Sequence, residues 1–334
     1  MKHPPYHLRP NKAVDRLLLV EAIRLSGSSY RYSDYTYYSL AGPFLEDLRV
    51  VDHFFPEMKL VSLESSEHTF ARQEFHRFNS QIVLQHRPFQ DFIINDYEPR
   101  TIEGRDVFWL DYTDLEYTNF SDFQITLRKV PLDSIVRITL RAEPDLNLER
   151  LDALLTSDEI QKIKTKTQHD FEEKFHRILP HPTPDSNSSL KIFARTVQLM
   201  VRRAASIALD TAGSERDFLP IQSTRYNDGT QMISITGIVH HRSNIKQTRD
   251  AFVSLRFADF DWIEPSSINI PSLSAKERMH LERYLPVNPG EDPGDVLFEA
   301  LKYNIDRSKT ETKKQLSNYA DYCRDYPNFI RTPV

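Results

Sequence analysis

Glycine, cysteine and long apolar runs are scarce in this chain of 334 residues. Only 8 glycines are present against 20 prolines, so a glycine that ends an apolar run is informative. The single cysteine, Cys323, excludes an internal disulfide and a zinc site built from cysteines. No apolar run approaches the ~18 residues of a membrane span, and "MKHPPYHLRPNK" lacks the apolar core of a signal peptide. We therefore expect a soluble cytoplasmic protein without a membrane span.

Composition and charge indicate a folded protein without a strong preference for polyanions. Hydrophobic residues make up 39% of the chain and aromatic residues 11%, enough to bury a core. The formal net charge of −5 gives no global attraction to nucleic acid, although a local basic face leaves that partner open.

Several familiar catalytic and metal-binding motifs are absent. The sequence has no Walker A loop, no Gly-x-Ser-x-Gly elbow and no His-Glu-x-x-His pair. His240 and His241 are adjacent, so on a strand they would point to opposite faces. We expect no metal site.

Short apolar strands alternate with helical patterns, which predicts an α/β fold with a parallel sheet. The strands are expected at about 35–41, 58–65, 81–86, 105–111 and 134–141. Two β-rich runs over 218–240 are joined by "YNDGT", which predicts a hairpin turning at 227–229. The five expected parallel strands and the two strands of the hairpin together predict a sheet of seven strands, of which the last is antiparallel.

The chain is expected to form a Rossmann-like domain over 1–244 and a mostly helical extension over 245–334. The charged stretch at about 145–190 interrupts the strand pattern and predicts a helical insertion.

Gly42 ends the first predicted strand and precedes a helix, as in a nucleotide-binding turn. Pro43 has no backbone N–H for a ligand, and Glu46 and Asp47 would repel a phosphate at the helix N-terminus. The same two acids could accept the positive charge of a sulfonium or ammonium group. Gly42 and Glu46 are therefore candidate cofactor contacts, with a plain turn and a solvated acid as the alternatives.

Carboxylates follow the next three strands. Glu64 ends the second strand, 22 positions after Gly42, close to the ~20 expected for an acid that binds a ribose. Asp91 lies after the third strand. Asp111 ends the apolar fourth strand, at the edge where open α/β sheets bind ligands. Each of these acids could instead cap a helix or lie in solvent.

"YHLRPNK", residues 6–12, places several polar side chains just before a helix expected at 11–26. Asn11 is a plausible N-cap of that helix. Arg9 and Lys12 could form a polar clamp over the cofactor, since arginine pairs with a carboxylate through two hydrogen bonds. A solvated arm is the alternative.

The order of these features resembles a class I S-adenosylmethionine-dependent methyltransferase. "YHLRPNKAVDR", "GPFLED", "LES" and "WLDYTD" also look like a group of bacterial proteins commonly labelled O-methyltransferases. The resemblance covers residues 6 to about 240 at the level of the fold.

The resemblance implies S-adenosylmethionine as the cofactor. It implies that Gly42 contacts the methionine part, that Glu64 binds the ribose and that Asp91 contacts the adenine. Asp111, with Tyr112 and Asp114 beside it, would face the methyl acceptor and carry the catalysis.

The first turn departs from the family pattern acid-x-Gly-x-Gly-x-Gly. Ser39, Leu40 and Ala41 precede Gly42, and Phe44 and Glu46 occupy the later glycine positions. This degenerate motif leaves two hypotheses open. The chain is a methyltransferase with an unknown acceptor, which we favour narrowly, or a binding or regulatory subunit without catalysis. In the second case a protein partner or a homo-oligomer is expected, for example in a bacterial antiviral defence system.

Overall fold

The computed structural model describes residues 9–27, 31–99, 104–144, 156–183, 185, 188–210 and 214–326. Its strands are β1 (Tyr35–Ser39), β2 (Lys59–Glu64), β3 (Val83–His86), β4 (Arg105–Asp111), β5 (Ile135–Arg141), β6 (Arg216–Asn227), β7 (Gln231–His241) and β8 (Ser266–Ile268). Its helices are α1 (Pro10–Ser26), α2 (Glu46–Phe54), α3 (Glu67–His76), α4 (Phe89–Asp91), α5 (Tyr117–Lys129), α7 (Ser157–Phe175), α8 (Leu190–Leu209), α9 (Ile245–Phe252), α10 (Ala275–Leu281), α11 (Pro293–Leu301) and α12 (Lys309–Tyr322). Short 3₁₀-helices are η2 (Tyr32–Asp34), η4 (Arg242–Asn244) and η5 (Glu282–Tyr284), and η3 (Phe92–Asp96) is one turn of π-helix.

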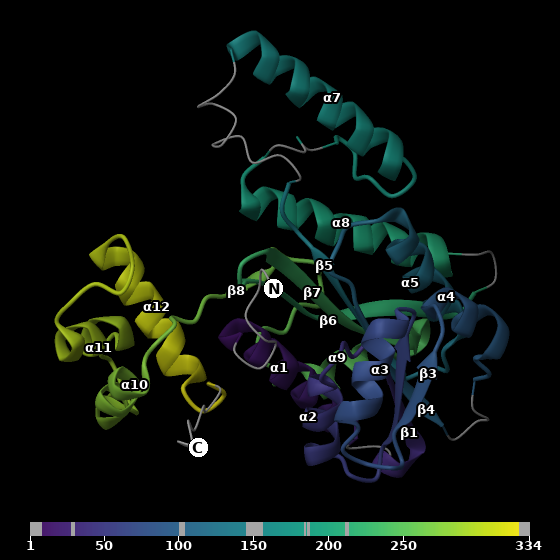
Figure 1. The fold of residues 1–334 in the computed structure, drawn as a ribbon, viewed down its shortest axis with the longest axis horizontal. Coiled ribbons are helices and arrows are strands. Elements are labelled where there is room, and N and C mark those ends of the chain that lie inside the picture. The colour runs from purple at the N-terminus through teal and green to yellow at the C-terminus, as the bar shows by residue number, and fades with distance from the viewer. Residues whose placement is uncertain are drawn as a thin grey trace. The chain divides into compact units, whose positions relative to one another are not determined.

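The strands form one sheet in the order β3-β2-β1-β4-β5-β7-β6-β8 (Figure 1). β1 to β5 are parallel, and β7 runs antiparallel to β5. The predicted α/β fold is confirmed, with β8 as an eighth strand beyond the expected seven. The strand order reverses between β1 and β4, and open α/β sheets bind ligands at the carboxyl ends of the strands on either side of such a reversal.

The predicted hairpin is β6 and β7. Its loop, residues 228–230, lies one residue later than expected. The side chain of Asn227 accepts a 2.9 Å hydrogen bond from the Gly229 amide, and Gly229 has φ +105°. An asparagine that hydrogen-bonds two residues ahead and a glycine at positive φ explain the turn.

One face of the sheet packs against α5 and α8, and we call it the α5/α8 face (Figure 1). Phe108 of β4 and Ile138 of β5 meet Phe123 of α5 and Val197 of α8 there, all fully buried. α8 has an apolar stripe over its whole length, as the helical period of its sequence predicts.

The opposite face of β4, β5 and β7 is buried but polar. Register pairs place Trp109, Arg137 and Thr236 side by side across these strands. Trp109 Nε1 donates to Thr139 Oγ1 at 2.9 Å, and an Arg137 nitrogen donates to Thr236 Oγ1 at 3.0 Å. This network fixes the strand that ends at Asp111.

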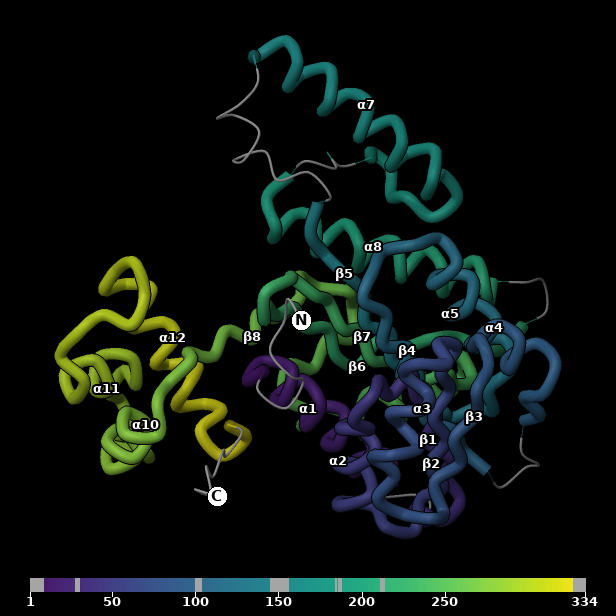
Figure 2. The backbone as a smooth tube through the Cα atoms, viewed as in Figure 1, coloured from purple at the N-terminus to yellow at the C-terminus, as the bar shows by residue number. Residues whose placement is uncertain are grey.

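The contacts divide the chain into two compact units. One comprises residues 1–18, 226–229 and 267–334, and the other comprises 19–225 and 230–266. In the first unit α11 and α12 pack side by side (Figure 2). The domain boundary near residue 244 stays a prediction.

The N-terminus of α1 differs from the sequence expectation. The helix begins at Pro10, which suits a first helical position, so Asn11 lies inside the helix and does not cap it. Asn11 Nδ2 instead donates to Asp228 Oδ1 at 2.9 Å, and the Lys12 amide donates to Asp228 Oδ2 at 2.9 Å. The carboxylate of the hairpin turn therefore serves as the helix cap.

The expected helical insertion contains α7, which begins with a capping box between Thr156 and Glu159. Residues 145–155 of that insertion lie outside the described part. No helix among the described residues is both long and apolar enough to cross a membrane.

Candidate cofactor and acceptor site

Two acids flank the end of β1 at the strand-order reversal. Ser39, the last residue of β1, is in register with Ser62 of β2 and Trp109 of β4. Glu64 and Asp111 each lie two residues further along, so both side chains leave the sheet on the same face as Ser39. Since neighbouring strands are ~5 Å apart, the two acids stand ~10 Å apart across the end of β1. The structure thus brings together two of the predicted site residues.

The Gly42 turn is held from α3. Gly42 has φ +61°, which a glycine adopts at low cost. Its carbonyl accepts a 2.9 Å hydrogen bond from Gln73 Nε2, while Gln73 Oε1 accepts one from Ser62 Oγ at 3.0 Å. Gln73 is fully buried and links β2 to the turn. The turn is therefore rigidly positioned although it has only one glycine.

A buried carboxylate lies beside the end of β1, next to this turn. Asp47, in the first turn of α2, is 7% exposed. It accepts a 3.0 Å hydrogen bond from the Tyr37 hydroxyl and a short one from Ser39 Oγ. Burial and then the charge of Asp47 raise the pKa of Tyr37 well above its usual value, and Asp111 adds to the shift. Both carboxylates therefore act on the same polar centre at the end of β1.

Glu64 is oriented by its own loop. Its Oε1 accepts a 2.8 Å hydrogen bond from the Ser66 amide, and the side chain is partly exposed. Oε2 accepts no hydrogen bond from the part of the chain that the structure describes. Glu46 is partly exposed at the start of α2, and Asp91 is exposed in the short α4.

The three residues expected to face the acceptor have different surroundings. Asp111 is partly exposed at the sheet edge. Tyr112 donates a 2.8 Å hydrogen bond to Asp122 of α5, and Asp114 accepts one of 2.9 Å from Asn119. Asp111 is the one of the three whose strand position directs it to the face of Glu64 and Ser39.

Asp122 has a raised pKa. Burial raises its pKa to about 6, and the hydrogen bond from Tyr112 opposes this shift. Its Oδ1 is buried and accepts no hydrogen bond from the described residues. Burial, then Asp122, raise the pKa of Tyr112, so this hydroxyl remains a neutral donor.

Arg9 and Lys12 lie in the first unit. Arg9 lines a cavity of ≈ 550 Å³ together with the hairpin turn at 227–229 and residues 269–272. The Lys12 ammonium lies 5.7 Å from the centre of the Tyr226 ring, and Lys12 is buried. The clamp hypothesis stays a prediction, and residues 6–8 of that segment lie outside the described part.

Sequence reasoning missed Tyr37, Ser39 and Gln73, and it named Asp47 beside Glu46 but carried only Glu46 forward as a cofactor contact. A signal was present for two of them, because Tyr37 and Ser39 alternate on one strand and must share a face. The choice between the adjacent acids Glu46 and Asp47 depends on the helix rotation, which the sequence does not fix.

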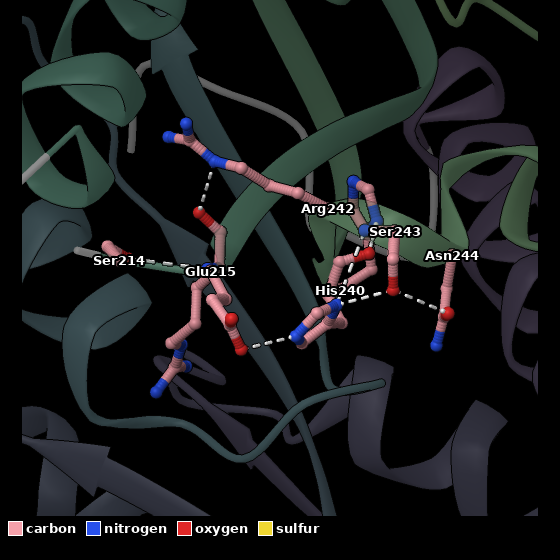
Figure 3. Close-up of polar contacts among 8 residues, drawn as sticks. Ser214, Glu215, His240, Arg242, Ser243 and Asn244 are labelled. Atoms are coloured by element: carbon pink, nitrogen blue, oxygen red, sulfur yellow. Dashed lines mark hydrogen bonds and ion pairs between the residues drawn. The ribbon is translucent and has the colours of Figure 1, made fainter.

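A second polar cluster lies at the carboxyl end of β7 (Figure 3). His241 Nε2 lies 2.7 Å from Glu215 Oε2, and His241 Nδ1 lies 2.6 Å from Ser243 Oγ. His240 is buried, and its Nδ1 lies 2.9 Å from the His241 carbonyl oxygen. These contacts link Glu215, the residue before β6, to the start of η4. Among the described residues no group of three His, Cys, Asp or Glu side chains could hold a metal ion.

Solved structures offer only distant likenesses. The Methanococcus jannaschii fibrillarin pre-rRNA processing protein is 11% identical at TM-score 0.35, with 64% of this chain and 68% of that chain covered. The plantazolicin methyltransferase BpumL in complex with SAH is 8% identical at TM-score 0.35, covering 68% and 84%. LepI in complex with SAM is 8% identical at TM-score 0.36, covering 65% and 46%. Likenesses at this level carry no argument about chemistry.

Among proteins with curated descriptions, none matches this chain. A family model matches residues 4–334 and confirms the resemblance drawn from the sequence motifs. The chain belongs to the family described as "Putative O-methyltransferase".

Proposed function

We propose that the chain transfers a methyl group from S-adenosylmethionine to a hydroxyl oxygen of a small acceptor. The observation that carries this proposal is the ring of acids around the end of β1: Asp47, Glu64 and Asp111. Family membership supports the reaction class.

The residues present fit the cofactor. S-adenosylmethionine, when bound, supplies an electrophilic methyl group on a positively charged sulfur. Asp47 and Asp111 give the end of β1 a negative potential, which suits that cation and the ammonium of the methionine part. Glu64 has one oxygen fixed by Ser66 and the other directed to accept hydrogen bonds from ribose hydroxyls.

Asp47 offers a physical answer to the missing acid of the first turn. The residues just before Gly42 include no carboxylate. Asp47 of α2 instead places its carboxylate against Ser39 at the end of β1. The negative charge is thus supplied from the helix instead of the strand. Gln73 holds the turn in place of further backbone contacts.

Asp111 is the residue that we expect to act on the acceptor. The carboxylate would accept a hydrogen bond from the acceptor hydroxyl, orient its oxygen and take its proton as the new C–O bond forms. The bound cofactor would supply the methyl group together with a neutral thioether as leaving group, so the proton that Asp111 takes balances the step. Alignment in a dry site supplies the remaining rate enhancement.

Calorimetric titration of the full chain with S-adenosylmethionine and S-adenosylhomocysteine tests the proposal. We expect both to bind, and Glu64→Ala to weaken both. Glu57→Gln serves as the matched control, because Glu57 is an exposed acid at the amino end of β2. Absence of binding by the folded wild type would contradict the proposal.

The altered turn favours a second candidate, a binding subunit without catalysis. Pro43 removes one backbone donor, and Phe44 lies where the family pattern has a glycine. The same titration separates the two, since a subunit that has lost the cofactor site would bind neither molecule.

A further inference from the structure

A cavity of ≈ 710 Å³ lies on the α5/α8 face of the sheet, at the edge formed by β1, β2 and β3. Its floor comes from alternate residues of these strands, Thr36, Tyr38, Val61 and Val83. Phe92 of η3 and the following Tyr97 form a wall. The volume lies within the range of small-molecule sites, ~300–1,000 Å³.

This cavity is separate from the candidate methyl-transfer site. Thr36 is the second residue of β1 and Lys59 is the first residue of β2, whereas the acids lie at the carboxyl ends. Thr36 and Tyr38 also point to the face opposite that of Tyr37 and Ser39, because side chains alternate along a strand.

The hydroxyl of Thr36 has no hydrogen-bond partner among the residues that the structure describes. Thr36 is 3% exposed, and its Oγ1 is buried. It sits in register between Lys59 of β2 and Asp106 of β4. A buried hydroxyl without a hydrogen bond destabilises a fold by ~1–3 kcal/mol, and valine would fill the same space without this cost. A ligand atom that hydrogen-bonds to this hydroxyl would remove the cost and explain why a threonine stands here.

The neighbouring hydroxyl does not need one. Tyr97 donates a 2.5 Å hydrogen bond to Asp106 Oδ2, and burial together with that carboxylate raises its pKa. Thr36 is thus the polar atom at the inner end of the cavity that a ligand would satisfy.

Aromatic rings form one wall of the cavity, beside the aliphatic Val61 and Val83 and the amides of Gln81 and Gln85. The Tyr38 ring lies 5.6 Å from the Phe92 ring and 5.8 Å from the Tyr97 ring, centre to centre. Val83 is 47% exposed at the edge strand. Such walls favour a planar aromatic body.

The charges at the mouth do not select an ion. Lys59 and Glu98 have opposite signs, and Asp96 forms an ion pair with Arg87. A neutral ligand fits this balance.

We propose that the cavity binds a small, neutral, planar aromatic molecule with one hydroxyl or amino group, whose polar atom pairs with Thr36 Oγ1. The site is additional to the methyl-transfer site and does not depend on it.

The test uses 4-fluorophenol and 4-fluorotoluene with the full chain, observed by fluorine NMR. Thr36→Val should weaken 4-fluorophenol about three- to tenfold, the effect of one net hydrogen bond, and leave 4-fluorotoluene unchanged. Val83→Trp should fill the cavity and weaken both probes. Phe75→Ala, at a residue 85% exposed on α3, is the control and should change neither.

The outcomes decide the proposal. It is overturned if the wild type binds neither probe at millimolar concentration, or if Thr36→Val and Val83→Trp leave 4-fluorophenol binding unchanged. Displacement of 4-fluorophenol by S-adenosylhomocysteine would place the probe at the methyl-transfer site and overturn the proposal too. If Thr36→Val fails to fold, Val83→Trp still decides whether the cavity is the site.

Discussion

The hydroxyl of Tyr37 on β1 donates a 3.0 Å hydrogen bond to the carboxylate of Asp47 on α2. The Gly42 turn lies between the two residues in the sequence, so this hydrogen bond links the strand before the turn to the helix after it. A buried carboxylate costs free energy unless hydrogen bonds compensate it, and Tyr37 and Ser39 provide them. The cost is understandable if the charge serves a cationic ligand.

Asp47→Asn should weaken cofactor binding because it removes this charge while keeping an oxygen that can accept a hydrogen bond. We expect a loss of ~1.5–3 kcal/mol in binding free energy, the usual size for a hydrogen bond to a charged group. Calorimetry should compare the loss of affinity for S-adenosylmethionine with that for S-adenosylhomocysteine, which shows the cofactor group that Asp47 contacts. A larger loss for S-adenosylmethionine than for S-adenosylhomocysteine would indicate the sulfonium, and equal losses the ammonium. Unchanged affinity for both would rule out this role.

Glu64→Ala should reduce the affinity for S-adenosylhomocysteine by a similar ~1.5–3 kcal/mol, because the ribose would lose its acceptor. Glu64→Gln should lose less, since an amide oxygen still accepts one hydrogen bond. Both variants should melt close to the wild-type temperature, as Glu64 is partly exposed. A folded Glu64→Ala chain with wild-type affinity would refute ribose binding.

Asp111→Asn should separate catalysis from binding. Affinity for S-adenosylhomocysteine should stay within about tenfold, roughly 1.4 kcal/mol. Turnover with catechol as the test acceptor should drop by ~10²–10⁴, the range for a lost general base. Asp250→Asn is the matched control, because Asp250 is exposed on α9 and is not a candidate site residue. Equal turnover in wild type and Asp111→Asn would exclude a catalytic Asp111.

Gln73→Met should destabilise the second unit. The substitution preserves volume but leaves the Ser62 hydroxyl and the Gly42 carbonyl without their partner, at ~1–3 kcal/mol each. Urea unfolding should therefore show a loss of ~2–6 kcal/mol, accompanied by weaker cofactor binding. Gln247→Met on α9 is the control, because Gln247 is exposed. A stability equal to wild type would show that the turn does not depend on Gln73.

The sequence predicts the strands well because each is a short apolar run that ends at a turn residue or an acid. It also predicts that Glu64 and Asp111 share the carboxyl edge, since strand ends of a parallel sheet meet there. Asp47 could not be chosen over Glu46, because helix rotation depends on packing against β1. Gln73 and Asp122 reach partners that are distant along the chain, and no local pattern marks such pairs.

Asp122 gives the chain a stability that depends on pH. Its pKa is raised to about 6 in the folded state, whereas an unfolded aspartate has ~3.9. The folded state therefore binds more protons than the unfolded state between these values. The stability that Asp122 contributes is fully present below about pH 4 and is lost as the pH rises through about 6. Asp122→Asn removes the titration while keeping an oxygen for Tyr112. Relative to wild type, the variant should gain ~1–2 kcal/mol between pH 4 and pH 7.5, a value reduced from the full shift because solvent reaches part of the group. Urea unfolding of both proteins at several pH values measures this difference. A difference between the two that does not change with pH would mean that Asp122 titrates alike in both states.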